Sequence, residues 1–216
     1  MEQQMIEKIR EKKLIAITRG VAPERIEKTA QALSEGGIGL MEITFDQRTD
    51  GADTVKSIAL LRERFEGKIY PGAGTVMTAE QVRLAAEAGA QYIISPNTDR
   101  AVIEETKRLG LVSIPGAFTP TEIAAAYQMG ADFVKIFPVA SLGAAYIKAV
   151  TAPLAHIPVL AVGGVTPANL KEFFKAGAVG CGIGSNLVNA SKIAAGDYAS
   201  VTEAAKAFCA ALRCGE

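Results

Sequence analysis

Short apolar runs rich in β-branched residues alternate along the chain with longer stretches whose apolar positions recur at helical spacing. The runs are typical of strands buried on both faces, and the stretches are typical of helices that cover such strands. The pattern predicts strands at Leu14–Thr18, Gly39–Thr44, Ile69–Gly72, Tyr92–Ser95, Val112–Pro115, Phe133–Phe137, Val159–Val162 and Gly180–Ile183. It predicts helices over residues 2–12 and over Ala22–Glu35, Ala79–Ala88, Arg100–Leu109, Thr121–Met129 and Ala168–Ala176.

Glycines mark the ends of several predicted helices, each just before the next strand. A glycine there supplies the left-handed turn that returns the chain to a sheet. Gly89, Gly110 and Gly130 are spaced 21 and 20 residues apart. Because each interval accommodates one strand and one helix, the spacing predicts repeated units in which helices connect parallel strands.

Eight such units follow the N-terminal helix without a linker, which predicts one α/β domain over residues 1–216. The expected fold is a single (β/α)8 TIM barrel. The competing architecture, a doubly wound open sheet, would have a glycine-rich dinucleotide loop after the first strand, and Thr18-Arg19-Gly20-Val21 is not such a loop. In a barrel, the chemistry is expected where the strands end and the following loops begin.

The composition limits which binding partners and which cellular compartment are expected. Lys and Arg together number 23, as do Asp and Glu, so the net charge is zero and neither nucleic acid nor a membrane surface is expected as a partner. No apolar run approaches the roughly 20 residues of a membrane span, and the polar first residues are not expected to form a signal peptide. Three cysteines without metal-ligand spacing favour the cytoplasm, and the single histidine, His156, argues against a histidine-based metal cage.

Two predicted strands carry a charge inside an apolar run. The strand period of two places Glu42 on one face with Leu40 and Thr44, and it aligns Lys135 with Phe133 and Phe137. A buried charge is costly unless it is paired, so the inner face near the barrel rim is the expected place for both. One interpretation is a structural ion pair. The other, which we favour, is a deprotonated amine beside a proton-moving carboxylate.

Polar residues at two strand ends are candidates for substrate binding. Arg19 follows the first strand, where its guanidinium could hold a substrate carboxylate in a two-pronged grip, although a solvated loop arginine is equally consistent with the sequence. Thr75 ends Gly72-Ala73-Gly74-Thr75, where a backbone can approach a ligand closely. The alternative for Thr75 is that it caps the next helix.

Glycine turns follow the last two predicted strands. Gly163-Gly164 comes after one, and Gly184-Ser185 comes after the other. Tight turns also need glycine, but two such turns on neighbouring strands favour a phosphate site. We expect backbone amides of these turns, and a short helix N-terminus after the second, to bind the phosphate.

These motifs together resemble those of a known family. The segments that carry the resemblance are Ile15-Ala16-Ile17-Thr18-Arg19-Gly20, Met41-Glu42-Ile43-Thr44, Gly72-Ala73-Gly74-Thr75-Val76, Ile94-Ser95-Pro96, Ile114-Pro115-Gly116, Val134-Lys135-Ile136-Phe137-Pro138 and Val162-Gly163-Gly164-Val165. From about Leu14 to the C-terminal helix, the chain is similar to the class I aldolases that cleave 2-keto-3-deoxy-6-phosphogluconate (KDPG) and 4-hydroxy-2-oxoglutarate (KHG).

The resemblance implies an activity and assigns roles. Lys135 is similar to the lysine that forms a Schiff base with the substrate ketone, and Glu42 is similar to the carboxylate that moves protons. The products would be pyruvate and an aldehyde, with no metal or organic cofactor, and the assembly would be a homotrimer. The resemblance also assigns the remaining site residues. Arg19 and Thr75 would hold the substrate carboxylate, and Pro96 and Phe137 would form pocket walls. The phosphate site would consist of Gly163, Gly164, Gly184 and Ser185.

The chain departs from the family pattern in two places. Many relatives have Arg-Thr directly after the glutamate strand, whereas here Phe45-Asp46-Gln47 intervene before Arg48-Thr49, so we assign the carboxylate to Arg19 and not to Arg48. Gluconate-specific members have a threonine before the glycine pair, where this chain has Val162. That motif resembles members acting on the galactonate epimer, so the sequence leaves the substrate's stereochemistry open.

Two other classes of function stay open at this stage. One is a barrel isomerase or epimerase acting on a phosphorylated sugar. The other is a non-catalytic phosphate-binding barrel with a structural Lys–Glu pair, against which the charged inner strands and glycine-lined rim both argue.

Overall fold

The computed structural model describes residues 2–213, and its elements follow the predicted alternation. The strands are β1 (Leu14–Thr18), β2 (Leu40–Thr44), β3 (Tyr70–Gly74), β4 (Tyr92–Ile94), β5 (Val112–Ile114), β6 (Gly116–Ala117), β7 (Val134–Ile136), β8 (Val159–Val162) and β9 (Gly180–Ile183). The helices are α1 (Glu2–Lys12), α2 (Pro23–Glu35), α3 (Ala52–Arg64), α4 (Ala79–Glu87), α5 (Arg100–Arg108), α6 (Pro120–Gln128), α7 (Gly143–Thr151), α8 (Leu170–Lys175), α9 (Ala190–Ala194) and α10 (Ala199–Arg213).

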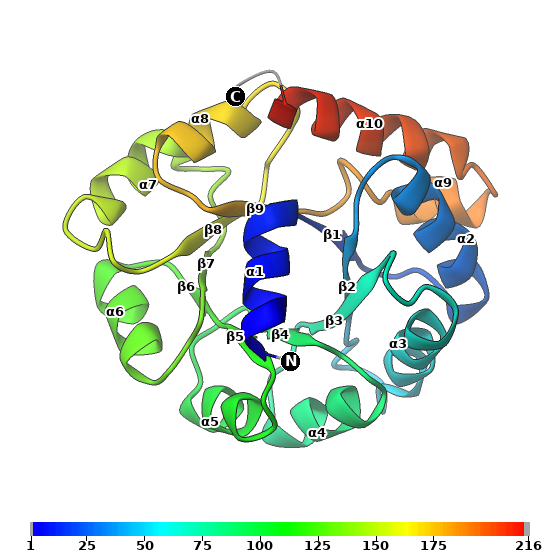
Figure 1. The fold of residues 1–216 in the computed structure, drawn as a ribbon, viewed down its shortest axis with the longest axis horizontal. Helices are drawn as coiled ribbons and strands as arrows, with labels where there is room; N and C mark the ends of the chain where they lie inside the picture. Colours follow the sequence, from blue (N-terminus) through cyan, green and yellow to red (C-terminus); the bar gives the residue numbers. More distant parts are fainter. Residues whose placement is uncertain (1, 214–216) are drawn as a thin grey trace.

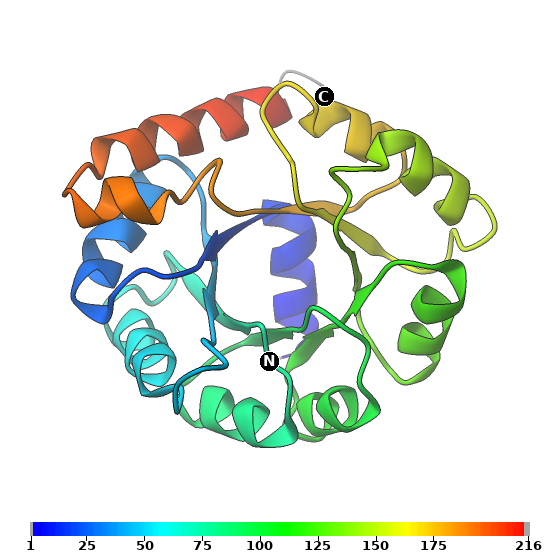
Figure 2. The same cartoon turned by 180° about the vertical axis from the view of Figure 1, so that it is seen from behind.

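The strands form one parallel sheet in the order β5-β4-β3-β2-β1-β9-β8-β7-β6. Its two ends, β5 and β6, are consecutive in the chain and are separated by Pro115 alone. Proline cannot donate a ladder hydrogen bond, so one strand position is divided into a half that pairs with β4 and a half that pairs with β7. The sheet therefore closes into an eight-position barrel ringed by helices (Figures 1 and 2), which confirms the predicted TIM barrel and excludes the open sheet.

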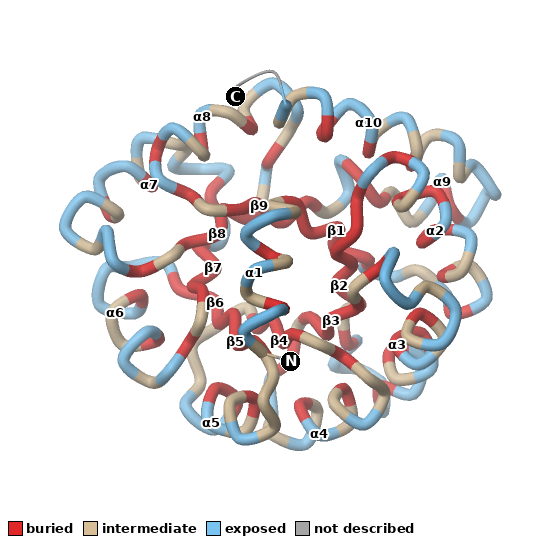
Figure 3. The backbone as a smooth tube through the Cα atoms, viewed as in Figure 1, coloured by how far each residue is buried: buried red, intermediate tan, exposed pale blue. Residues whose placement is uncertain are grey.

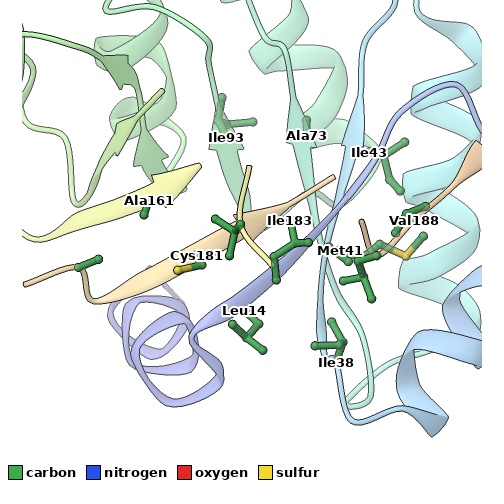
Figure 4. Close-up of a cluster of buried hydrophobic side chains, with 14 of the residues drawn as sticks. Leu14, Ile38, Met41, Ile43, Ala73, Ile93, Ala161, Cys181, Ile183 and Val188 are labelled. Carbon is green, nitrogen blue, oxygen red and sulfur yellow. The ribbon is translucent and has the colours of Figure 1, made fainter. Parts of the chain in front are cut away.

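The larger hydrophobic core lies between the barrel and the surrounding helices. The outward-facing strand residues Leu14, Met41, Ile43 and Cys181 belong to this layer and are at most 4% exposed (Figure 4). Figure 3 shows the result, with buried strands at the centre and exposed backbone on the outer sides of the helices. This layer explains why the strands have apolar residues at consecutive positions instead of alternating ones.

A second, smaller core fills the amino-terminal half of the barrel interior. Leu40, Tyr92 and Phe133 point inward there and pack with Met5 and Ile9 of α1. Helix α1 lies across this end of the barrel (Figure 1). Because this end is filled by apolar side chains, open space for chemistry is left at the carboxyl ends of the strands.

The structure also refines the sequence prediction. Helices α3, α7, α9 and α10 occupy segments for which no range was predicted, and the strand expected at Val112–Pro115 is shortened by its own proline. The predicted domain, 1–216, extends past the described residues at both ends. Within residues 2–213, no helix has both the length and the hydropathy needed to cross a membrane.

Candidate active site

Glu42 on β2 and Lys135 on β7 both lie inside the barrel, 1% and 5% exposed. Their strand neighbours two residues earlier, Leu40 and Phe133, belong to the inner core, so the alternation of the strands places both charged groups above that core. Oε1 of Glu42 is buried and has no hydrogen-bond partner. Nζ of Lys135 lies 4.9 Å from the centre of the Phe137 ring. The charged groups thus face the interior, as the strand pattern predicts.

Burial shifts the pKa values of both groups toward their neutral forms. It raises the pKa of the Glu42 carboxyl, and the positive charges of Lys135 and Arg19 partly oppose this shift. It also lowers the pKa of the Lys135 amine, an effect that Arg19 reinforces and Glu42 opposes. A lowered pKa increases the fraction of the amine that has a free, nucleophilic lone pair, and a raised pKa increases the fraction of the carboxyl that holds a proton to donate.

Glycines of β3 provide the space that Glu42 and the inner-core residue Tyr92 occupy. A Cβ at Gly74 would lie 1.9 Å from Oε1 of Glu42, and one at Gly72 would lie 2.1 Å from Cε2 of Tyr92. Side chains essentially never approach this closely, so neither position accepts a larger residue without displacing its neighbour. The carboxyl of Glu42 is therefore seated directly against the backbone of β3, one residue before Thr75.

Arg19 and Thr75 meet at the rim above Glu42. Nη2 of Arg19 donates a hydrogen bond to Oγ1 of Thr75 at 3.0 Å, although the two residues are 56 positions apart. The charge of Arg19 acts on both Glu42 and Lys135. This places a guanidinium and a hydroxyl beside the carboxyl–amine pair, in the arrangement that could hold a substrate carboxylate.

Arg48 is engaged elsewhere. Its side chain is 88% exposed and binds Asp46 of the same loop with two hydrogen bonds, of 2.9 and 2.7 Å. These bonds lower the pKa of Asp46 to about 2. Arg48 thus pairs with a carboxylate of its own loop, and the assignment of the substrate carboxylate to Arg19 stays a prediction.

Phe137 and Pro96 line a cavity of about 370 Å³ at the same rim, between the loops after β4 and β7. Phe137 is 39% exposed, and its ring lies near both this cavity and the Lys135 amine. The two predicted pocket walls are therefore neighbours, with Phe137 in contact with the amine and Pro96 farther out.

The two glycine turns lie side by side after β8 and β9. Gly163 and Gly164 have φ values of 98° and 75°, and a Cβ on Gly163 would lie 3.4 Å from the Phe137 ring. Asn186, beside Gly184 and Ser185, ties the second turn to the first, since its Nδ2 donates to the Val165 carbonyl at 2.8 Å. The turns are thus continuous with the Lys135 end of the site.

One detail of the expected phosphate site is different. The chain makes a single turn after β9, where the amides of Leu187 and Val188 both donate to the Gly184 carbonyl. Helix α9 begins only at Ala190 and is capped by Asn189. A complete turn therefore separates Gly184 from the start of α9.

Sequence reasoning missed Gln47 and Gln81, which lie beside Thr75. Nε2 of Gln47 donates to the Thr75 carbonyl at 2.7 Å, and Nε2 of Gln81 donates to Oε1 of Gln47 at 3.1 Å. A polar residue in a loop carries no periodic signal, so the contact of Gln47 with Thr75, 28 positions away, could not be found from the chain alone.

The fold and the site define a parallel α/β barrel with a buried amine and a buried carboxyl in its interior. Comparison with known proteins identifies the family of barrels to which it belongs. The sequence profile of the family described as "KDPG and KHG aldolase" matches residues 5–204. The chain therefore belongs to the KDPG and KHG aldolase family and is an aldolase.

Individual relatives agree with this assignment. A 2-dehydro-3-deoxy-6-phosphogalactonate aldolase of Escherichia coli is 38% identical over 83% of this chain and 86% of its own length. A 2-dehydro-3-deoxy-phosphogluconate aldolase of Treponema pallidum is 39% identical over 84% and 86%. The KDPG aldolase of Legionella pneumophila, solved with pyruvate as a covalent carbinolamine, superposes with a TM-score of 0.82 at 28% identity, covering 91% of this chain and 94% of that one.

Proposed function

We propose that the protein is a class I aldolase that cleaves a 2-keto-3-deoxy-6-phospho sugar acid to pyruvate and glyceraldehyde 3-phosphate through a Schiff base on Lys135. The observation that carries the proposal is a lysine 5% exposed, with its pKa lowered by burial, beside a buried carboxyl. The covalent pyruvate adduct named for the Legionella pneumophila relative supports it.

The reaction begins at the Lys135 amine. Its lone pair attacks the C2 ketone to give a carbinolamine. The protonated carboxyl of Glu42 gives its proton to the departing hydroxyl, so that water leaves, a protonated imine forms and Glu42 becomes a carboxylate. Glu42 takes the proton of the C4 hydroxyl as the C3–C4 bond breaks, the aldehyde leaves, and the bonding electrons move into the imine to form an enamine. Protonation of C3 and hydrolysis of the imine release pyruvate and regenerate the amine, so no metal or organic cofactor is needed.

The rest of the site would hold the two ends of the substrate. Arg19 and Thr75 would bind the carboxylate next to the ketone, since both lie beside Glu42. The turns at Gly163-Gly164 and Gly184-Ser185 would bind the phosphate through backbone amides. Relatives of nearly equal identity are named for the galactonate and for the gluconate substrate, so both epimers stay candidates. Unphosphorylated KHG would occupy only the carboxylate end. The homotrimer and the cytoplasmic location stay predictions.

Borohydride trapping tests the covalent step. Pyruvate with borohydride should inactivate the enzyme and add a reduced pyruvate unit to the peptide that contains Lys135. Lys135→Arg should abolish both trapping and turnover, because a guanidinium stays protonated at neutral pH and forms no imine. Lys148→Arg, at an exposed lysine of α7, is the matched control and should behave as wild type.

Labelling at another lysine would overturn the mechanism. Turnover of Lys135→Arg would favour an isomerase or epimerase, and a protein without turnover on any substrate would favour a non-catalytic barrel. A panel of KDPG, its galactonate epimer and KHG, read out by pyruvate release, then identifies the preferred substrate.

A further inference from the structure

Thr75 adopts a backbone conformation that its side chain disfavours. Within residues 2–213, it is one of two non-glycine residues with a positive φ, at 55°. A β-branched residue remains in this left-handed region only where its surroundings hold it there. The hydroxyl that accepts the hydrogen bond from Arg19 therefore owes its position to whatever restrains the Thr75 backbone.

Two glutamines from different elements restrain this backbone. Gln47, in the loop between β2 and α3, donates from Nε2 to the Thr75 carbonyl at 2.7 Å. Gln81, in the first turn of α4, donates from Nε2 to Oε1 of Gln47 at 3.1 Å. Oε1 of Gln81 in turn accepts the Met77 amide at 2.7 Å. We call this chain of hydrogen bonds, from Met77 through Gln81 and Gln47 to Thr75, the glutamine relay.

The relay has one consistent orientation. A backbone amide can only donate, so the Met77 amide requires Oε1 of Gln81 to face it. Nε2 of Gln81 must then face Gln47, which directs Oε1 of Gln47 toward Gln81 and Nε2 of Gln47 toward the Thr75 carbonyl. Both ends of the relay are backbone groups of one short segment, so two side chains hold residues 75–77 in a single geometry.

Backbone bonds to the neighbouring strands leave one group for Gln47 to hold, the Thr75 carbonyl. The peptide unit before Thr75 is held by the Phe45 amide, which donates to the Gly74 carbonyl at 2.8 Å. Asp46 and Arg48, on either side of Gln47, bind each other.

On the opposite side of the segment, the Val76 amide donates to the Ile94 carbonyl at 3.2 Å. The Thr75 carbonyl and the Val76 amide belong to one peptide unit, which Gln47 and Ile94 hold from two sides. Loss of the Gln47 bond would leave this unit held at its amide alone, so the unit could tilt and shift the Thr75 hydroxyl relative to Arg19.

We propose that Gln47 is a positioning residue for substrate binding, which sets the Arg19–Thr75 grip on the substrate carboxylate by fixing the Thr75 backbone. This inference rests on the proposed function, because Arg19 and Thr75 contact the carboxylate only if the substrate is a 2-keto acid bound at Lys135. Gln47 itself touches no reacting atom. Its effect is therefore expected on the affinity for pyruvate and not on the covalent chemistry.

The test measures how borohydride trapping of Lys135 depends on pyruvate concentration in Gln47→Leu, a variant of similar size that cannot donate or accept. We expect the half-saturating pyruvate concentration to rise about tenfold or more, as for loss of one hydrogen bond to a charged group, with full labelling at saturation. Methyl pyruvate, which lacks the carboxylate charge, should shift much less. Gln31→Leu, which removes an exposed glutamine bonded to Glu35 on α2, is the matched control.

Other outcomes separate the inference from the proposed function. An unchanged half-saturation in Gln47→Leu, or equal shifts for pyruvate and methyl pyruvate, would overturn the positioning role while trapping at Lys135 persists. Wild type that traps no pyruvate would overturn the proposed function itself. If Gln47→Leu does not fold, Gln81→Leu tests the same relay from α4 and should give the same selective loss. Where both fold, the double variant should be no worse than either single one, because both break one chain of bonds.

Discussion

Glu42 and Lys135 are coupled through their charges, and this coupling is the main electrostatic feature at the scale of single residues. Burial disfavours the charged form of each, while each charge stabilises the other. The amine is therefore deprotonated at a lower pH than an exposed lysine would be. The negative charge of Glu42 limits how far burial lowers the pKa of Lys135.

Glu42→Gln should separate the two roles of this carboxyl. Without the negative charge that raises it, the pKa of Lys135 falls further, so the acid limb of imine formation should move to lower pH. Turnover should fall by about 10²–10⁴-fold, because the proton of the C4 hydroxyl has lost its acceptor. The measurements are the pH dependence of borohydride trapping and the rate of pyruvate release.

A thermal melt of the same variant is the control. If Glu42 serves only as a structural partner of Lys135, Glu42→Gln should retain turnover and lose stability. An acid limb that moves to higher pH would contradict the electrostatic assignment.

Strand residues of the candidate site could be predicted from the sequence, and loop residues could not. Glu42 and Lys135 stand out because a charge in an apolar run breaks a local pattern that burial imposes. Gln47 breaks no pattern, and its importance arises from a hydrogen bond to Thr75 that only the folded chain creates. The same holds for Asp46, whose pairing with Arg48 depends on how the loop turns.

At the scale of elements, the turns after β8 and β9 differ in how they tolerate a side chain. A Cβ on Gly164 would lie 2.7 Å from Cβ of Ala140, and the positive φ of Gly163 and Gly164 makes any substitution there strained. Gly184 has no positive φ, and a Cβ there would meet no atom within 4 Å. It is the position where a side chain can enter the proposed phosphate site without damage to the fold.

Gly184→Val should therefore raise KM for phosphorylated substrates by about tenfold or more, because the side chain would displace the phosphate from roughly one hydrogen bond to a charged group. Thermal stability should change little. Unphosphorylated KHG should be cleaved almost as well as by wild type. Comparing kcat/KM for a phosphorylated substrate and for KHG tests whether the turn at Gly184 binds phosphate. Equal losses on both would mean that the turn supports the barrel and binds no phosphate.

The alternation of elements was predictable, but their ends were not. Each βα unit can be recognised from its apolar runs and its terminal glycines, which are local features of the sequence. The division of one strand at Pro115 and the late start of α9 depend on which neighbour each backbone group pairs with. Such pairing is a tertiary property that no window of sequence contains.

For the molecule as a whole, stability and chemistry are assigned to opposite ends of the barrel. Ile9 of α1 is 1% exposed and packs into the inner core, on the side away from the rim that carries Arg19 and Thr75. Asp132 and Glu2 both bind Lys107, Asp132 at 2.6 Å, and so connect the start of α1 to α5 and to the approach to β7. Helix α1 thereby covers the end of the barrel opposite the candidate active site.

Ile9→Ala should cost about 2–5 kcal/mol of unfolding free energy, the usual range for such a truncation in a core. The kcat of the folded enzyme should stay within about twofold of wild type, because the cavity forms at the far end of the interior. Urea unfolding and steady-state kinetics measure the two quantities. Gln4→Ala, at an exposed position of α1, is the control, and a large loss of kcat in Ile9→Ala would show that the two ends are linked.

The closure of the barrel was predictable at this scale because eight repeated units with short connections leave few other arrangements. The filling of its interior was not. The filling of the interior depends on which inward positions have small residues and on which large side chains pack against them. Tyr92 packs against Gly72 in this way, and Glu42 packs against Gly74.

That filling has a consequence for how tolerance to substitution is distributed over this protein. In a library of all single variants selected for growth on the substrate, Gly74 should be as intolerant as Glu42, although a glycine performs no chemistry. Even the Cβ of an alanine at position 74 would lie only 1.9 Å from Oε1 of Glu42, which is too close for two atoms that are not bonded. Glu42 and the glycine that leaves room for it would therefore be selected together, and a search for site residues that considers only functional groups would miss Gly74.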